Sequence, residues 1–378
     1  MVARRSANAN RDSRAVFTRH LLGITCIAVL CVIFSLGLWP FHAPVNDVEW
    51  LADRNGLRFG RFATVFSSGE LPPPTENRAP GTIEIWLEPS RIWDFSTFLS
   101  FWAPDDVSRF SLRQWQTGLL LKGTQELQID NVFPRTGPAF LAITTGPRGT
   151  VVYVDGAVVK RAPEYKLASN VLTGRLVLGD SPGQSDSWRG RLLGLGIYGR
   201  ELTAEQIVGH FLSWTRGKRP SIVEGQGAIA LYPFDEHHGR IVHNNSGAGA
   251  ELQIPQKYTV LDQIFLETPW SEFRRTSGFW EAVVKNIVGF VPLGVCFYGY
   301  FSLVRLSRTA VFTTIVLGFA VSLTIEVLQA FLPTRASGMT DLITNTLGTL
   351  VGIVACKAAI AQPRLRAYLE TASLRPIR

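Results

Sequence analysis

The chain has 378 residues, of which 46% are hydrophobic and 18% are charged, and its formal net charge is +8. This length has room for two or three domains. The excess of Lys and Arg does not indicate a nucleic-acid-binding protein, because much of it lies beside hydrophobic spans, where cationic residues orient a helix in a membrane.

The 4 cysteines all lie within apolar spans, and the middle of the chain has none. They are Cys26, Cys31, Cys296 and Cys356. A disulfide framework is therefore not expected, and the cysteines are predicted to pack as small apolar side chains.

Residues 1–20 form an arginine-rich segment with one acid, Asp12, and we expect this basic tail to lie in the cytoplasm. The uncharged run Leu21–Trp39 follows. Roughly 20 apolar residues span a bilayer, whereas the core of a signal peptide has about 7–15. Because no small-x-small cleavage site follows the run, we predict an uncleaved transmembrane helix at residues 21–40, with a cleaved signal peptide as the alternative.

Short β-rich runs separated by turn residues occupy residues 45–255, and TIEIWLEP and GRLVLGD are examples. The run AFLAITTGPRGTVVYVDGAVV (Ala139–Val159) contains two turns, GPRG and DG, and predicts a meander of three strands. Such a region with few helical stretches is typical of a β-sandwich or barrel. One short helix is expected at Arg200–Trp214, with Thr203 as its N-cap.

A longer pattern, W-x-G … I-Y-x-R-x-L-T, closes this region. It comprises Trp188, Gly190, Ile197, Tyr198, Arg200, Leu202 and Thr203. Together with TVVYVDGAVV before it, the pattern resembles laminin-G-like or concanavalin A-like jelly-roll domains over residues 57–213. The resemblance implies an all-β sandwich that binds glycans, proteins or lipids. Some domains of this group are glycanases.

The candidate glycanase acids are Glu84 and Glu88 in TIEIWLEP. A glycanase needs two carboxylates about 5–5.5 Å apart for retention or 6.5–9.5 Å apart for inversion. Residues four apart on a strand share a face, but the middle acid of the E-x-D-x-x-E-like set of such glycanases is missing. We therefore expect solvated acids on a strand, with catalysis as the alternative.

The segment Ala228–Pro255 is predicted to add strands to the sandwich. Its candidate metal ligands are Asp235, Glu236, His237, His238 and His243. Adjacent histidines on a strand point to opposite faces, so we expect a polar hairpin and no metal there. Calcium takes oxygen ligands from scattered loops, which leaves Asp155, Asp180 and Asp186 as candidates for Ca²⁺ on the sandwich.

Residues 256–284 are predicted to form an interfacial connector, because aromatic and basic residues gather there. They are Trp270, Phe273, Arg274, Arg275, Phe279 and Trp280. Three further transmembrane helices are expected at about residues 287–304, 309–332 and 341–360. The basic RLSR turn, Arg305–Arg308, lies between the first two, and a basic tail, residues 361–378, follows the third.

Polar residues recur in and beside these last three spans. They are Asn286 before VPLG, Glu326 and Gln329 in IEVLQ, Arg335 in the next loop, and Asp341 and Asn345 in DLITNTLG. Such side chains are costly in hydrocarbon, so they should face a bundle interior and find partners there. Asn345, Gly348 and Gly352 lie along one side of the last span, where small residues permit close helix packing. Arg335 and Asp341 could form a charge pair.

These motifs, in this order, resemble the VanZ-like family of bacterial membrane proteins over about residues 280–360. The family includes a protein linked to resistance against glycopeptide antibiotics such as teicoplanin, and its biochemical activity is not established. We take as candidate binding residues Asn286, Glu326, Gln329, Arg335, Asp341 and Asn345, with Glu326 and Asp341 as the candidate catalytic acid, base or ligand. In the alternative interpretation, these groups only hold helices together.

The topology follows from the short basic segments. The N-terminal tail, the RLSR turn and the C-terminal tail are all expected in the cytoplasm, which is consistent with four spans. This arrangement places the β domain outside the cytoplasm and predicts a multi-pass protein of the inner membrane.

Taken together, the sequence predicts an α + β multidomain membrane protein. An all-β jelly-roll sandwich at residues 45–255 is inserted between the first transmembrane helix and a VanZ-like three-helix bundle at residues 285–360. We expect a protein of the cell envelope that binds a glycan or another ligand and affects glycopeptide sensitivity. The alternatives are a membrane enzyme or transporter acting on a lipid-linked envelope precursor, and a scaffold for protein partners. A non-enzymatic role is favoured, and the bilayer, but no nucleic acid, is an expected partner.

Overall fold

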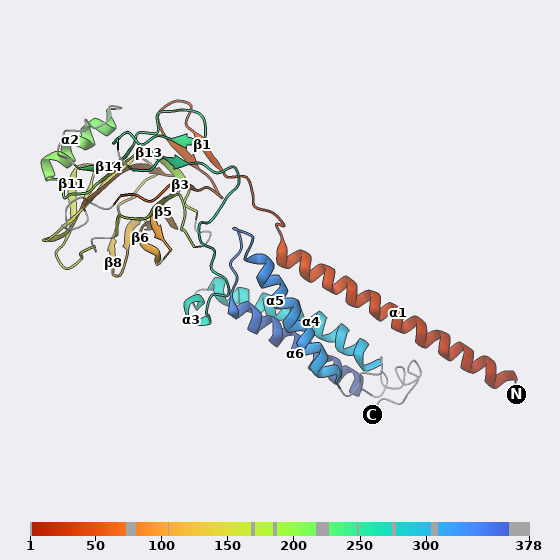
Figure 1. The fold of residues 1–378 in the computed structure, drawn as a ribbon. Coiled ribbons are helices and arrows are strands. Elements are labelled where there is room, and N and C mark those ends of the chain that lie inside the picture. Colours follow the sequence, from red (N-terminus) through yellow and green to blue (C-terminus); the bar gives the residue numbers. More distant parts are fainter. Residues whose placement is uncertain are drawn as a thin grey trace. The chain divides into compact units, whose positions relative to one another are not determined.

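The structure is a computed structural model that describes residues 2–72, 81–104, 106–167, 171–183, 187–216, 227–247, 249–273, 277–303 and 309–362. The chain folds into two compact units (Figure 1). One is helical and combines Met1–His42 with Ile264–Arg378, and the other, Ala43–Gln263, is the β domain. The β domain is thus an insertion within the helical unit.

Two antiparallel sheets make up the β domain. The first has the order β1 (Val48–Trp50), β2 (Leu57–Phe59), β13 (Gly190–Tyr198), β4 (Gly81–Pro89), β9 (Ala139–Gly146), β10 (Gly149–Val154) and β11 (Ala157–Ala162), with β14 (Ala228–Tyr232) also paired to β13. The second has the order β15 (Ile241–Val242), β16 (Leu252–Gln253), β3 (Val65–Ser67), β12 (Arg175–Leu178), β5 (Asp94–Ala103), β6 (Asp106–Gln116), β7 (Gly118–Lys122) and β8 (Glu126–Ile129). The predicted sandwich and its three-strand meander, β9–β10–β11, are confirmed.

The core of the sandwich follows the two-residue period of its strands. On β4, Ile83, Ile85 and Leu87 are buried in the main core, while the residues between them face the other side of the sheet. The W-x-G motif has a packing explanation, because Trp188 is fully buried and a Cβ added to Gly190 would lie 2.2 Å from its ring.

The predicted short helix is α2 (Ala204–Thr215). Thr203 and Gln206 form a capping box, in which the Thr203 side chain accepts from the Gln206 N–H and the Gln206 side chain accepts from the Thr203 N–H. The face of α2 with Ile207 and Trp214 is buried against the first sheet. A Cβ added to Gly194 on β13 would lie 2.5 Å from the Trp214 ring, so this glycine gives the helix room to approach.

Both ends of the β domain lie side by side. The segment after residue 227 adds β14 to one sheet and β15 and β16 to the other, as predicted. Val45 forms a β-bridge with Lys257, and the Asn46 amide donates to the Pro255 carbonyl at 3.0 Å. The chain therefore enters and leaves the sandwich at one place.

The helical unit contains α1 (Val2–Leu38), α3 (Pro269–Glu272), α4 (Ser277–Leu303), α5 (Ala310–Gln329) and α6 (Met339–Ala361). Four of these helices are long and apolar enough to cross a membrane, namely Val16–Leu38, Gly278–Leu303, Ala310–Gln329 and Met339–Ala361. Helix α4 begins within the predicted connector, because no helix-breaking residue separates Phe279 from the apolar span. The RLSR turn lies outside the described residues.

Glycines bring α4 and α6 into close contact. A Cβ added to Gly294 would lie 2.1 Å from the Thr349 carbonyl oxygen, and one added to Gly352 would lie 2.2 Å from the Val291 carbonyl oxygen. Gly348 meets the Ile287 carbonyl in the same way, at 2.2 Å. The small residues predicted along one side of the last span thus lie where the backbones approach most closely.

Candidate functional site

The first pair of polar residues links α4 to α6. The Asn286 amide donates to the Asp341 carboxylate at 2.7 Å, across two helices whose sequences lie far apart in the chain. A hydrogen bond to a carboxylate is stronger than one between neutral groups. Each of the two side chains thereby avoids the free-energy cost of facing lipid without a hydrogen-bond partner.

Glu326 is almost completely buried, with 1% of its surface exposed. Its carboxylate accepts the backbone N–H of Gly338 at 2.9 Å. Gly338 is the N-cap residue of α6 and has no side chain with which to cap the helix, so Glu326 supplies an acceptor from α5. A carboxylate at a helix N-terminus is also favoured by the helix dipole.

Asn345 lies further along α6, and it too is buried. Its amide donates to the Ser322 hydroxyl on α5 at 3.0 Å. Ser322 and Glu326 are four residues apart and share one face of α5. Asn345 and Glu326 therefore join the same two helices at successive levels.

The segment between α5 and α6, residues 330–338, is named the junction loop here. On the α1 side, the Arg335 guanidinium donates to the carbonyls of Leu36 and Trp39, and Gln329 just before the loop donates to the Gly37 carbonyl at 2.7 Å. These contacts hold the end of α1, from which the chain leaves for the β domain.

On its other side, the junction loop holds the segment through which the chain returns. The Glu267 N–H donates to the Ser337 carbonyl at 2.9 Å, and the Met339 N–H donates to the Glu267 carbonyl at 2.9 Å. The junction loop is therefore bound to both connections that lead to the inserted domain. Its own position is fixed by Glu326 through Gly338.

The six predicted binding residues thus fall into two groups. Asn286, Asp341, Glu326 and Asn345 join α4, α5 and α6, while Gln329 and Arg335 contact the end of α1. Such contacts are expected of polar side chains that hold helices together. A ligand-binding or catalytic role for them, and the Arg335–Asp341 charge pair, stay predictions.

For Glu84 and Glu88 the structure corrects the expectation of solvated acids. Both face away from the main core as predicted, but α2 covers that face at Glu84, which is 0% exposed. Glu88 forms ion pairs with Arg54 at 2.6 Å and Arg191 at 2.9 Å. Both carboxylates are thus bound by protein side chains.

Glu84 lies in a buried polar cluster between β4, β13 and α2. One carboxylate oxygen lies 2.8 Å from Nδ1 of His210, and the other accepts from the Tyr198 hydroxyl at 3.2 Å and the Trp214 indole at 3.3 Å. Burial, followed by the neighbouring Glu84 charge, raises the pKa of Tyr198 well above its ordinary value. The cluster attaches the helix to the sheet.

His210 could have been found from the sequence. Ile207, His210 and Trp214 share one face of the predicted helix by their three- and four-residue spacing. A histidine on the apolar face of a helix needs a buried partner. In the structure this partner is Glu84 on β4, 2.8 Å from Nδ1 of His210.

The candidate metal ligands do not gather at one site. Asp180 is buried and accepts from Ser187 and Tyr258, Asp155 accepts the Phe140 N–H at 2.9 Å, and Asp186 lies outside the described residues. The separate candidates His243 and Glu236 contact each other at 3.3 Å, and His237 contacts the Leu51 carbonyl. In the described part of the chain, no three His, Cys, Asp or Glu residues come together as a metal site would require.

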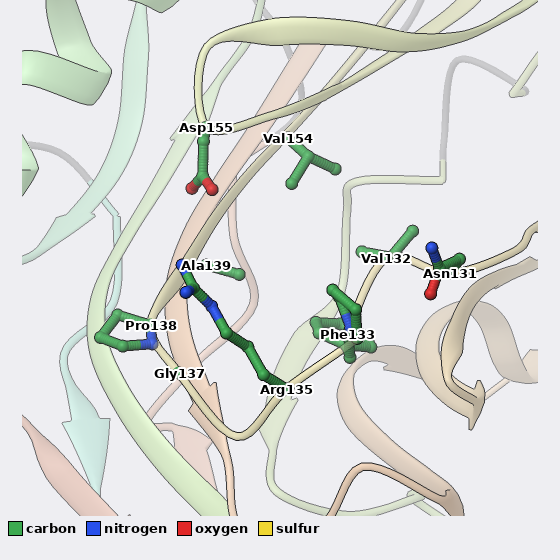
Figure 2. A pocket seen from close by; sticks show the side chains of 10 residues that line it. Asn131, Val132, Phe133, Arg135, Gly137, Pro138, Ala139, Val154 and Asp155 are labelled. Atoms are coloured by element: carbon green, nitrogen blue, oxygen red, sulfur yellow. The ribbon is translucent and has the colours of Figure 1, made fainter.

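A cavity of about 350 Å³ opens between the β8–β9 loop and the β10–β11 turn. It is lined by Asn131, Val132, Phe133, Pro134, Arg135, Gly137, Pro138, Ala139, Val154 and Asp155. In Figure 2 the Arg135 guanidinium and the Asp155 carboxylate point toward each other, and Asn131 lies at the far end. The loop has no hydrophobic periodicity, which is why the sequence did not indicate it.

An exposed aromatic cluster lies on the second sheet. Trp93 is 59% exposed and Phe95 is 42% exposed, and their rings are in edge-to-face contact at 6.1 Å. Phe95 also contacts Trp115 at 4.9 Å. The amide of the buried Gln114 donates to the carbonyls of Arg91 and Ile92, which fixes the loop that carries Trp93.

Two family models match the chain. The model described as VanZ/LLP1 matches residues 228–361, and the one described as the concanavalin A-like lectin/glucanases superfamily matches residues 66–208. The VanZ/LLP1 match begins at β14, well before residue 280, where the sequence motifs begin. No curated protein matches the chain.

Solved structures similar to the chain include a candidate carbohydrate binding protein from Bacteroides ovatus, with 13% identity, a TM-score of 0.36 and coverage of 54% of this chain and 63% of that one. A sialidase from Trypanosoma rangeli has 17% identity, a TM-score of 0.35 and coverage of 47% and 30%. A pentraxin from Limulus polyphemus has 12% identity, a TM-score of 0.35 and coverage of 58% and 95%. The chain spans less than two thirds of the length of the first two, and similarities this low carry no functional argument. The chain therefore combines a VanZ-like domain, matched through the last three apolar helices, with a concanavalin A-like sandwich of the laminin G type.

Proposed function

We propose that this chain is an integral membrane protein of the bacterial cell envelope that recognises an envelope glycan through its sandwich. The VanZ-like bundle responds to that recognition, and the protein thereby lowers sensitivity to glycopeptide antibiotics of the teicoplanin type. In this proposal the sandwich lies outside the cytoplasm, and both chain termini lie inside it.

The observation that carries the proposal is the junction loop. Arg335 holds the end of α1, and the backbone of Ser337 holds Glu267, so one loop of the bundle contacts both connections to the inserted domain. A change in the sandwich that pulls on either connection acts on residues 330–338, and through Gly338 on the buried Glu326. Two tethers on one loop suit a receptor better than a simple membrane anchor, for which α1 alone would suffice.

The alternative of an enzyme with Glu326 and Asp341 as its catalytic groups has less support. Each carboxylate already holds a structural partner, the Gly338 N–H and the Asn286 amide respectively. Under the receptor proposal, Glu326→Gln keeps an oxygen acceptor for Gly338 and therefore keeps function. A catalytic carboxylate would not tolerate this change.

The experiment compares full-length variants in a glycopeptide-susceptible bacterium, scored by the minimal inhibitory concentration of teicoplanin at equal membrane level. We expect the parent protein to raise this concentration, Glu326→Gln to behave as the parent, and Arg335→Gln to lose the effect because the α1 tether is released. Full-length protein in nanodiscs is titrated in parallel with saccharides of the envelope. Failure of all saccharides to bind, or loss of protection in Glu326→Gln with normal folding, would refute the receptor proposal.

A further inference from the structure

The cavity at the β8–β9 loop has the features of a formed binding site. Its floor is fixed, because Val132 and Phe133 are buried in the main core and the Phe133 N–H donates to the Thr117 carbonyl at 2.7 Å. Its opposite wall is fixed as well, because Asp155 exchanges two hydrogen bonds with the backbone of Phe140, at 2.8 and 2.9 Å. A site that is already rigid loses less entropy when a ligand binds.

The backbone of this wall has a simple explanation. Asp155 and Gly156 have φ values of 50° and 79°, as both central residues of a type I′ turn require. The turn by itself therefore indicates no function. What it does is place the Asp155 side chain over the cavity (Figure 2), where one of its carboxylate oxygens accepts the Phe140 N–H.

Arg135 is the second charged group of the cavity. Within the described ranges its guanidinium makes neither a hydrogen bond nor an ion pair, although Asp155 faces it. Other arginines of the sandwich are paired with acids, Arg54 and Arg191 with Glu88 and Arg58 with Glu49. An arginine that faces a cavity and has no hydrogen-bond partner among the described residues is available to an anion, which it binds through two parallel hydrogen bonds.

These three side chains define the chemistry of a ligand. Arg135 fits a carboxylate or phosphate, while Asp155 and Asn131 fit hydroxyl and amide groups, and the walls supplied by Pro134, Pro138 and Val154 are apolar. The volume of about 350 Å³ is at the lower end of the range of about 300–1,000 Å³ for small-molecule pockets. This size suits a single sugar unit with its substituent.

We propose that the cavity between the β8–β9 loop and the β10–β11 turn binds an anionic saccharide unit, with Arg135 on the acidic group and Asp155 and Asn131 on hydroxyls. The proposal rests on the proposed function and names its site and ligand class. The aromatic cluster of Trp93, Phe95 and Trp115 is the competing place for a sugar, because pyranose rings pack on exposed aromatic faces. The arginine of that cluster, Arg113, stacks on Trp115 and donates to the Phe95 carbonyl at 3.1 Å, so the cluster would favour neutral saccharides.

The test titrates full-length protein in nanodiscs with a hexuronic acid oligosaccharide, a sugar phosphate oligomer and a neutral oligosaccharide of equal length. We expect at least one anionic probe to bind at least tenfold more tightly than the neutral one. Arg135→Gln is expected to weaken that binding at least tenfold, and Asp155→Asn to weaken it less, because asparagine keeps an acceptor for Phe140. The matched control Arg161→Gln removes an exposed arginine from β11, outside the cavity, and is expected to change nothing.

Each other outcome has a definite meaning. Unchanged binding in Arg135→Gln, with loss in Trp93→Ala, would overturn the proposed site while leaving the receptor proposal intact. Equal binding of neutral and anionic probes would overturn the ligand class. If the parent protein binds no saccharide, the glycan part of the proposed function fails, and this inference fails with it.

Discussion

The buried cluster around Glu84 allows a sharp test of how the sandwich is held together. His210→Ala removes the closest partner of a carboxylate that is 0% exposed and leaves it with Tyr198 and Trp214 as donors. Losing a hydrogen-bond partner of a buried polar group costs about 1–3 kcal/mol, and more when that group is charged. We expect the free energy of unfolding of the sandwich to fall by this amount.

The melting temperature is the convenient readout. For a domain of about 150–250 residues, 1 kcal/mol corresponds to about 2–4 °C, so His210→Ala should lower it by roughly 2–12 °C. Intrinsic tryptophan fluorescence of the full-length protein in detergent is suitable, because Trp214 lies in the cluster. The control Val208→Ala, at an exposed position of α2, should stay within about 0.5 kcal/mol of the parent.

A double-mutant cycle separates the charge effect from lost packing. In a Glu84→Gln background no carboxylate is left without its partner, so His210→Ala should cost less by about 0.5–3 kcal/mol. Hydrogen exchange at Ala204–Thr215 should rise in His210→Ala, since the cluster attaches this helix to the sheet. Additive effects of the two substitutions, or a melting temperature unchanged by His210→Ala, would show that the pair does not hold the helix.

Three further predictions concern packing, capping and pH. Gly294→Ala should reduce thermal stability or membrane level, since its Cβ would lie 2.1 Å from a carbonyl oxygen of α6. The control Gly289→Ala should not, because a Cβ at Gly289 would have nothing within 4 Å. Equal behaviour of the two variants would contradict the described helix contact. Glu326→Leu should lower the free energy of unfolding by about 1.5–3 kcal/mol, the contribution of a hydrogen bond to a charged group. Glu326→Gln should lower it much less, and thermal unfolding in detergent measures both. Burial raises the pKa of Tyr198, so its native form keeps a proton that the unfolded chain releases above about pH 10. Stability should therefore be full below pH 10 and fall above it, with a shallower fall in Tyr198→Phe, and a melting temperature independent of pH up to 11 would disprove this.

Strand patterns predicted the sandwich well because its core follows directly from alternation. The alternation on β4 correctly placed Glu84 on the face away from Ile83 and Ile85. It could not tell whether that face meets water or another element, since the covering helix lies more than a hundred residues later in the chain. The environment of an outward-facing residue is a tertiary property, and here it replaced an expected solvated acid with a buried one.

The start of α4 was missed for a different reason. Aromatic and basic residues near Trp280 have the composition of a membrane interface, which led to the prediction of a separate connector. Composition does not decide where a helix begins, and the stretch from Gly278 to Lys285 contains no proline to interrupt it. The Glu281–Lys285 pair, at 2.6 Å and four residues apart, lies on one continuous helix.

The polar residues of the bundle show what sequence reasoning can reach in a membrane domain. The cost of a bare polar group in hydrocarbon predicted that Glu326 and Asn345 are buried, and both are. It did not identify their partners, because a backbone N–H such as that of Gly338 has no sequence signature.

The same contacts give the junction loop two unequal sides. Its hold on α1 depends on the side chains of Arg335 and Gln329, whereas its hold on Glu267 consists of main-chain hydrogen bonds. Main-chain bonds persist through most substitutions, so sequence change can loosen the α1 connection without loosening the return connection. Under the receptor proposal, a signal that passes through this loop is adjusted at α1, while the buried Glu326 keeps the loop bound to the start of α6.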